Sequence, residues 1–316
     1  MFNLVRNEWM KIFRRVGTYV MLAILVVSIG VTGAAFKFLD STAKESADWK
    51  KGVQTEIAND KKVLQETPRL NGYMKEEINK NIAINEYRLE NGIKPYSKEN
   101  VWSYVEKNAY LVMFVGLFTI IVSAGIVASE FSWGTIKLLL IRPISRSKIL
   151  ISKYITVLLY GLGQLAILFV ISFLLGLILF GGFGESAHLV YIDGNVIEQN
   201  MVWYLIKTYL LKTIDVAMMA TMAFMISAVF RSSSLAIGIS VFLLFTGSNL
   251  TDLLAFKFDW AKYSLFANTD LTQYIGFQQP LVKGMTLGFS VTILLIYFLI
   301  FQMLAFIFFT KRDVSS

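Results

Sequence analysis

The side chains that most often carry enzymatic chemistry are scarce in this chain. Its 316 residues include no cysteine and a single histidine, His188, which excludes disulfides, thiolate catalysis and zinc sites with sulfur ligands. A lone histidine in a polar loop is more often a solvated residue than a metal ligand or a proton relay. The sequence also has no serine–histidine arrangement, no GxxxxGK[ST] stretch and no soluble segment large enough for a nucleotide-binding domain. We therefore expect a chain that is not an enzyme and that holds no cofactor or metal of its own.

Two groups of polar residues interrupt otherwise apolar stretches. Lys212 and Asp215 are three positions apart, so they share one face of a helix and can form an ion pair. Charges at that depth face protein or water, either as a structural pair that fixes helix packing or as part of a substrate path or dimer-interface latch. Asn249 and Asp252 form a similar polar cluster at the outer end of a later apolar run.

The composition is that of a membrane protein. Hydrophobic residues make up 55% of the chain and aromatic residues 14%, more apolar surface than one water-soluble core can bury. The net charge of +8 would suggest nucleic-acid binding in a soluble protein. Here the basic residues lie at the ends of apolar runs, where they suit the anionic inner leaflet. Membrane lipid, and no nucleic acid, is the expected partner of these charges.

Five long uncharged runs and one further apolar segment, 201–230, which carries Lys207, Lys212 and Asp215, predict six membrane-spanning helices. About 20 apolar residues are needed to cross the hydrocarbon layer. Lys and Arg are concentrated in the segments that lie inside if the N-terminus is cytoplasmic, so we expect a multi-pass protein of the bacterial inner (cytoplasmic) membrane with both termini in the cytoplasm. The predicted segments are an interfacial amphipathic helix at 1–16, spans at 17–37, 108–129, 149–182, 201–230, 231–251 and 285–310, an extracellular insert at 38–107, a cytoplasmic segment at 130–148, an extracellular loop at 183–200, an outer interfacial or re-entrant loop at 252–284 and a cytoplasmic tail at 311–316.

Two of these segments leave alternatives open. The first span could be a cleaved signal peptide, although its apolar run is longer than usual and the amphipathic segment before it suits the inner membrane surface. The insert carries apolar residues at helical spacing on both sides of Thr67-Pro68 and Asn71-Gly72, which predicts two amphipathic helices that form an external cap. A flexible polar loop is the alternative, because the apolar faces are narrow.

The segment that joins spans two and three carries the most informative pattern. The residues singled out in it are Glu130, Trp133, Gly134, Thr135, Arg142, Pro143, Arg146 and Lys153. Gly134 allows close backbone approach, and Pro143 stops a helix before the third span begins. Aromatic and aliphatic residues can form one face of a helix along the membrane, while the charges can pair with a cytosolic partner. The alternative is a basic loop that only sets the topology.

In its order of residues this segment resembles the cytoplasmic signature of ABC-2-type permeases, the membrane subunits of bacterial ABC exporters such as those for bacitracin, lantibiotics and sodium. The resemblance implies a coupling helix that docks on a separate ABC nucleotide-binding ATPase subunit, which binds the ATP and Mg. It also implies a homodimer or a heterodimer with a sister permease, and export of an amphiphilic substrate such as a peptide antibiotic, hence antimicrobial peptide resistance.

The expected fold class is an all-α membrane protein with six transmembrane helices, an N-terminal interfacial amphipathic helix, a cytoplasmic coupling helix and a helical extracellular insert. Two other functions stay open. A secondary transporter or channel is favoured by inverted repeats or broken helices with midplane charges, and neither is visible. A non-transporting membrane sensor or scaffold would be built around the external cap.

Overall fold

The computed structural model describes residues 1–42, 49–67, 72–95, 100–136, 143–182, 187–192, 194–230, 232–275 and 280–311. Within them the chain is mostly helical, with one small two-stranded sheet. Six stretches of helix in these residues are long and apolar enough to cross a membrane, which confirms the predicted number of spans. They are α2 (Val16–Thr42), α6 (Val112–Ser132), α8 (Arg146–Phe180), α9 (Met201–Val229), α10 (Ser233–Ala255) and α12 (Leu287–Lys311), with α5 (Val101–Asn108) and the 3-10 turn η1 (Ala109–Leu111) leading into α6.

Helix α6 lies at the centre of the bundle and packs closely against α9. Small residues make this approach possible, because they let two backbones come together and exchange hydrogen bonds within the membrane. The Ser123 hydroxyl donates to the carbonyl of Ala220 at 2.7 Å. In return, the Ser227 hydroxyl accepts the backbone N–H of Ala128 at 3.0 Å. Most of α6 is buried inside the chain, whereas α12 is largely exposed.

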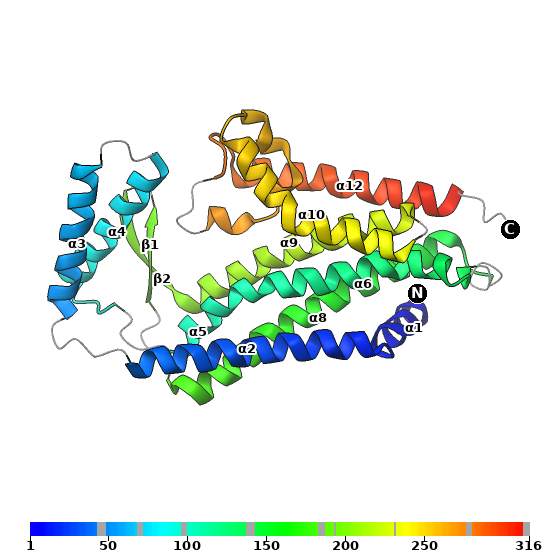
Figure 1. Ribbon diagram of the computed structural model, residues 1–316, viewed down its shortest axis with the longest axis horizontal. Helices are drawn as coiled ribbons and strands as arrows, with labels where there is room; N and C mark the ends of the chain where they lie inside the picture. Colours follow the sequence, from blue (N-terminus) through cyan, green and yellow to red (C-terminus); the bar gives the residue numbers. More distant parts are fainter. Residues whose placement is uncertain are drawn as a thin grey trace.

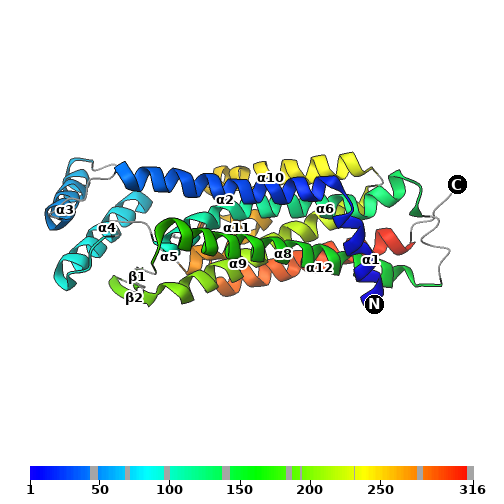
Figure 2. The same cartoon turned by 90° about the horizontal axis from the view of Figure 1, so that it is seen from below.

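The two ends of the elongated bundle carry different structures (Figure 1). At one end, called the terminal end here, the short helix α1 (Phe2–Phe13) lies across the bundle (Figure 2), and the last turn of α12 reaches the same end on the other side of the bundle (Figure 1). The opposite end, called the cap end, carries α3 (Trp49–Glu66) and α4 (Gly72–Asn91). These two helices pack together through Val53, Ile57 and Ile82. The predicted pair of helices in the insert is therefore present.

The cap end also holds the antiparallel strands β1 (Ala187–Ile192) and β2 (Asn195–Asn200). The all-α prediction is wrong at this point. The Asp193-Gly194 dipeptide is a strong hairpin signal between residues of high β-propensity. Gly194 has φ +87°, a conformation that glycine adopts without steric cost, and the register pairs Ile192 with Asn195 across the turn.

Between α10 and α12 the chain forms η2 (Asp259–Tyr263), α11 (Leu265–Asn268) and η3 (Leu271–Tyr274). This segment folds back along α10. A Cβ added at Gly247 would lie only 2.3 Å from the ring of Phe266, so the glycine is what allows the aromatic ring to lie against the helix. Since Gly247 lies two turns before the end of α10, part of the segment lies well inside the limits of the span.

Candidate functional site

Four charged side chains meet at the terminal end and form a closed set of ion pairs, called the charge cluster here. The Lys153 ammonium lies 2.7 Å from a carboxylate oxygen of Glu8 and 3.0 Å from one of Glu130. The Lys11 ammonium lies 2.9 Å from Glu8 and 3.0 Å from Glu130. Each carboxylate therefore contacts both ammonium groups, and the cluster as a whole is neutral.

The cluster joins three elements that are far apart in the sequence. Glu8 and Lys11 come from α1, Glu130 from the last turn of α6 and Lys153 from the second turn of α8. The Thr135 hydroxyl adds a hydrogen bond to the second oxygen of Glu130. Only 1% of the Lys153 side chain is exposed, against 41% for Lys11. Because buried charges are tolerated only when paired, this arrangement fixes α1 against the bundle.

The pKa of Lys11, which lies outside the spans, responds to these contacts. Burial alone would lower it, but the hydrogen bonds and charges of Glu8 and Glu130 outweigh that effect and raise the pKa above its ordinary value of 10.5. Lys11 is therefore charged at any physiological pH.

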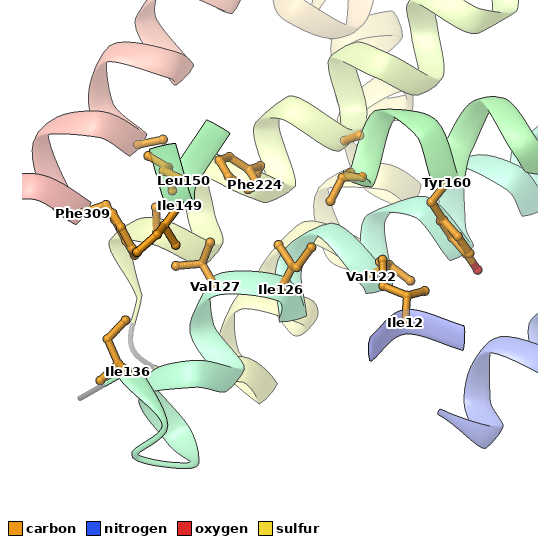
Figure 3. Close-up of a cluster of buried hydrophobic side chains, with 14 residues drawn as sticks. Ile12, Val122, Ile126, Val127, Ile136, Ile149, Leu150, Tyr160, Phe224 and Phe309 are labelled. Carbon is orange, nitrogen blue, oxygen red and sulfur yellow. The ribbon is translucent and has the colours of Figure 1, made fainter. Parts of the chain in front are cut away.

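A cluster of buried hydrophobic side chains lies at this end of the bundle (Figure 3). Ile12, one turn after Glu8 on α1, packs in it with Ile126 of α6 and Ile149 of α8. Since the same three helices supply both the apolar contacts and the charges, α1 is held by packing and by directed ion pairs together.

The other residues singled out between spans two and three are spread over this end. Trp133 follows α6 and is 66% exposed, with the Arg15 guanidinium 5.0 Å from its ring centroid. Gly134 has φ +70° and allows the turn after α6, and Pro143 is exposed. Arg146 has a partner within the chain, because its guanidinium donates to the carbonyl of Thr310 in the last turn of α12 at 3.0 Å. Arg142 and much of the predicted coupling helix lie outside the described residues.

The ion pair predicted between Lys212 and Asp215 is not the one that the structure forms, although the charge of Lys212 still acts on Asp215. The Lys212 ammonium instead binds Asp270 in η3 at 2.8 Å, because the folded-back segment brings that carboxylate to α9. Thr269 lies beside Asp215. Burial of Asp270 opposes ionisation, but the charge and hydrogen bonds of Lys212 and Thr272 prevail and lower its pKa below 3.8.

Asn249 and Asp252, the second group of polar residues predicted within the apolar runs, do not join the ion pair of Lys212 and Asp270. Asn249 and Asp252 are exposed on α10, and the Asn249 amide donates to the carbonyl of Phe245 on its own helix at 2.7 Å. Among the described residues, no group of three or more His, Cys, Asp or Glu side chains is placed to hold a metal ion.

Sequence reasoning missed Glu8 and Asp270. A signal for Glu8 was present, since it is the only acidic residue before Asp40 in a strongly basic N-terminal segment. An isolated acid in such a segment points to a basic partner elsewhere in the fold. Asp270 carried no comparable signal, because its contact depends on how the loop after α10 folds back.

Comparisons with known proteins place the chain among proteins whose function is not established. The family model described as "Protein of unknown function (DUF2705)" matches residues 73–315. "Uncharacterized protein YhcI" of Bacillus subtilis is 54% identical over 322 aligned residues that cover 100% of both chains. "Uncharacterized membrane protein YdbK" of the same organism is 34% identical over 219 residues, which cover 68% of this chain and 84% of the relative. With its six candidate spans, the chain is a multi-pass membrane protein.

These matches overturn the family assignment made from the segment between spans two and three. They indicate the family of unknown function and no ABC-2-type permease family. The pattern that suggested the assignment covers only about 25 residues and consists of a glutamate, a Gly-Thr pair, an aliphatic run, an Arg-Pro pair, a Ser-Arg pair and a lysine between two spans. Several of its members are basic residues. Such residues collect at the inner ends of membrane helices for topological reasons in unrelated proteins.

Proposed function

The chain belongs to the family of proteins of unknown function DUF2705, and we propose that it is the membrane-spanning subunit of a transporter that is powered by a separate cytosolic ATPase. The terminal end would face the cytoplasm, since the basic residues around α1 and the start of α8 suit the anionic inner leaflet. The mechanical role of this end is argued from its contacts and not from the resemblance to ABC-2-type permeases.

The charge cluster is the observation that carries the proposal. Through Glu8, Glu130 and Lys153 it ties the surface helix α1 to two spans. Arg146 ties the start of α8 to the end of α12 in the same region. A partner that pushes on this end would therefore move several spans together, because packed helices shift between discrete arrangements and do not deform smoothly.

The energy source would lie in the partner. The sequence has no phosphate-binding loop, so ATP and Mg would be held by the other subunit. The exposed indole of Trp133 is the contact we assign to that subunit, since exposed tryptophan side chains are frequent anchors of protein interfaces.

A second copy of the chain, or a sister subunit, would cover α10. Asn249 and Asp252 are exposed on this helix among the apolar side chains of Phe242 and Phe245. Polar groups are costly in hydrocarbon, and asparagine between helices promotes their association.

The large apolar surface of the spans suits an amphiphilic substrate, such as a peptide antibiotic, and export is the direction we propose.

The test is whether an ATPase copurifies with the tagged chain from its native membrane. We expect Trp133→Ala to weaken that association at least tenfold without a change in thermal stability. Trp260→Ala is the matched control, since Trp260 is also exposed, at 56%, but lies at the cap end; it should leave the association unchanged.

A deletion strain should also become more sensitive to membrane-active peptides, and depletion of cellular ATP should stop their export. The proposal fails if no ATPase copurifies and if export in energised vesicles follows the proton gradient when ATP is absent. That second result would assign the chain to the secondary transporters.

A further inference from the structure

A half-open cavity of about 480 Å³ lies at the terminal end, between α1, the turn after α6 and the start of α8. The charge cluster forms part of its wall. Arg14, Arg15 and Trp133 also line it, and Leu4, Ile144 and Ile149 supply apolar surface. The cavity thus has a basic side and an apolar side.

The charges of this cavity do not balance. Within the charge cluster two ammonium groups offset two carboxylates. The guanidinium groups of Arg14 and Arg15 remain, and among the described residues no carboxylate forms an ion pair with either of them. Arg15 stacks over Trp133, which orients its N–H donors without consuming them. The cavity lining and the buried Lys153 of the adjoining charge cluster together carry an excess of two positive charges.

Exposed apolar side chains lie on the two helices next to the cavity. Phe2 of α1 is 78% exposed, and Val16 and Tyr19 at the start of the first span are exposed as well. These apolar side chains would lie in the boundary between headgroups and acyl chains. The basic side chains of the cavity would then lie at headgroup depth, since they follow directly after α1 and precede the span.

We propose that this cavity binds the headgroup of an anionic phospholipid from the adjacent leaflet. Arg14 and Arg15 would hold the phosphate, because the planar guanidinium group matches phosphate oxygens with two parallel N–H donors. Leu4 and Ile144 would contact the glycerol and the first methylene groups. The bound lipid would brace α1 next to the charge cluster. This inference goes beyond the proposed transport function and does not require it.

The experiment measures lipid retention by the detergent-purified full chain with native mass spectrometry. Short-chain phosphatidylglycerol, short-chain phosphatidylcholine and inorganic phosphate are the three probes. We expect phosphatidylglycerol to bind at least tenfold more tightly than phosphatidylcholine, and phosphate alone to bind weakly, because it lacks the apolar contacts. The double variant Arg14→Gln/Arg15→Gln should lose at least tenfold in affinity for phosphatidylglycerol.

Arg6→Gln is the matched control, since Arg6 is an exposed arginine of the neighbouring helix α1 that does not line the cavity. The affinity of the Arg6→Gln variant for phosphatidylglycerol should equal that of the natural chain. A loss as large as that of the Arg14→Gln/Arg15→Gln variant would show diffuse attraction to α1 and overturn the proposal. Equal binding of phosphatidylcholine, or of inorganic phosphate, would overturn it as well. If the double variant does not fold, Arg14→Lys/Arg15→Lys keeps the charge but loses the paired donors; it should bind less tightly, and unchanged affinity would contradict the proposed geometry.

Discussion

Both ends of the helical bundle hold charged side chains that join a peripheral segment to the spans, but the two arrangements differ. At the terminal end, four alternating charges form a closed neutral cluster that includes the fully buried Lys153. At the cap end, Lys212 forms an ion pair with Asp270, and 47% of the Asp270 side chain is exposed. The peripheral segment is α1 in the first case and the segment that contains η3 in the second.

The two arrangements should contribute differently to stability. Removing one partner from a buried ion pair leaves a charge with no compensation, whereas an exposed pair is screened by water and contributes little. A buried cluster need not be more stable than apolar packing of the same shape, but it is satisfied in one position of α1 only. We therefore expect the terminal end to be the rigid attachment and the cap end to be the adjustable one.

The largest effect is expected from Lys153→Met, which removes the central cation of the charge cluster. Glu8 and Glu130 would then share only Lys11, whose side chain is partly exposed. The loss of a buried partner should lower the free energy of unfolding by about 3–5 kcal/mol. Thermal unfolding of the purified protein in detergent measures this loss.

The double variant Glu8→Gln/Lys153→Met is the control for that prediction. It removes one charge of each sign and leaves Lys11 paired with Glu130, so it should recover much of the stability lost in the single variant. A single variant as stable as the natural chain would show that the cluster does not hold α1.

The second prediction concerns the attachment at the cap end, where Phe266 lies against Gly247. The Gly247→Ala change places a methyl group 2.3 Å from the aromatic ring, so the ring and its segment must move. We expect a loss of about 1–3 kcal/mol, the usual range for overpacking.

Gly238→Ala on the same helix is the matched control, because nothing lies within 4 Å of its added Cβ. That change should be neutral or stabilise the protein by up to about 1 kcal/mol, since alanine favours a helix over glycine. If both alanine variants have the same stability, the contact between Phe266 and Gly247 does not hold the segment.

The sequence predicted the parts of the fold that follow from local pattern. Long apolar runs are sufficient to find six spans, and helical spacing with clear breakers found α3 and α4. The hairpin was missed because its alternating residues are few and lie next to a span.

The candidate site was only partly predictable, because its contacts join residues far apart in the chain. Glu130 and Lys153 were singled out from one segment, but the side chain that completes their charges is Glu8, more than a hundred positions away. The wrong partner for Lys212 has the same cause. Helical periodicity proposes Asp215 at a spacing of three, while a loop can bring Asp270 from outside the helix.

The smallest effect is expected from Lys212→Met, which removes the ion pair with Asp270. Because 47% of the Asp270 side chain is exposed, the carboxylate that is left behind is less enclosed than Glu8 and Glu130, of which 9% and 10% are exposed. We expect a loss of at most about 1 kcal/mol at neutral pH, well below that of Lys153→Met.

The pH dependence of stability is a second test of the ion pair between Lys212 and Asp270. The folded-state pKa of Asp270 is lowered from its ordinary value of 3.8, against the effect of burial, by the charge and hydrogen bonds of Lys212 and by Thr272. A lowered carboxyl pKa contributes stability that is fully present well above pH 3.8 and is lost as the pH falls through the folded-state value. The part of the difference between the natural chain and Lys212→Met that comes from Asp270 should therefore be constant from about pH 5 upward and shrink below about pH 4. Urea unfolding of both proteins from pH 3 to pH 7 measures it, with Lys207→Met on the same helix as a control that should show no such trend. If Lys212→Met lowered the free energy of unfolding as much as Lys153→Met does, Lys212 would be as critical as the charge cluster, and the cap end could not be called the adjustable attachment.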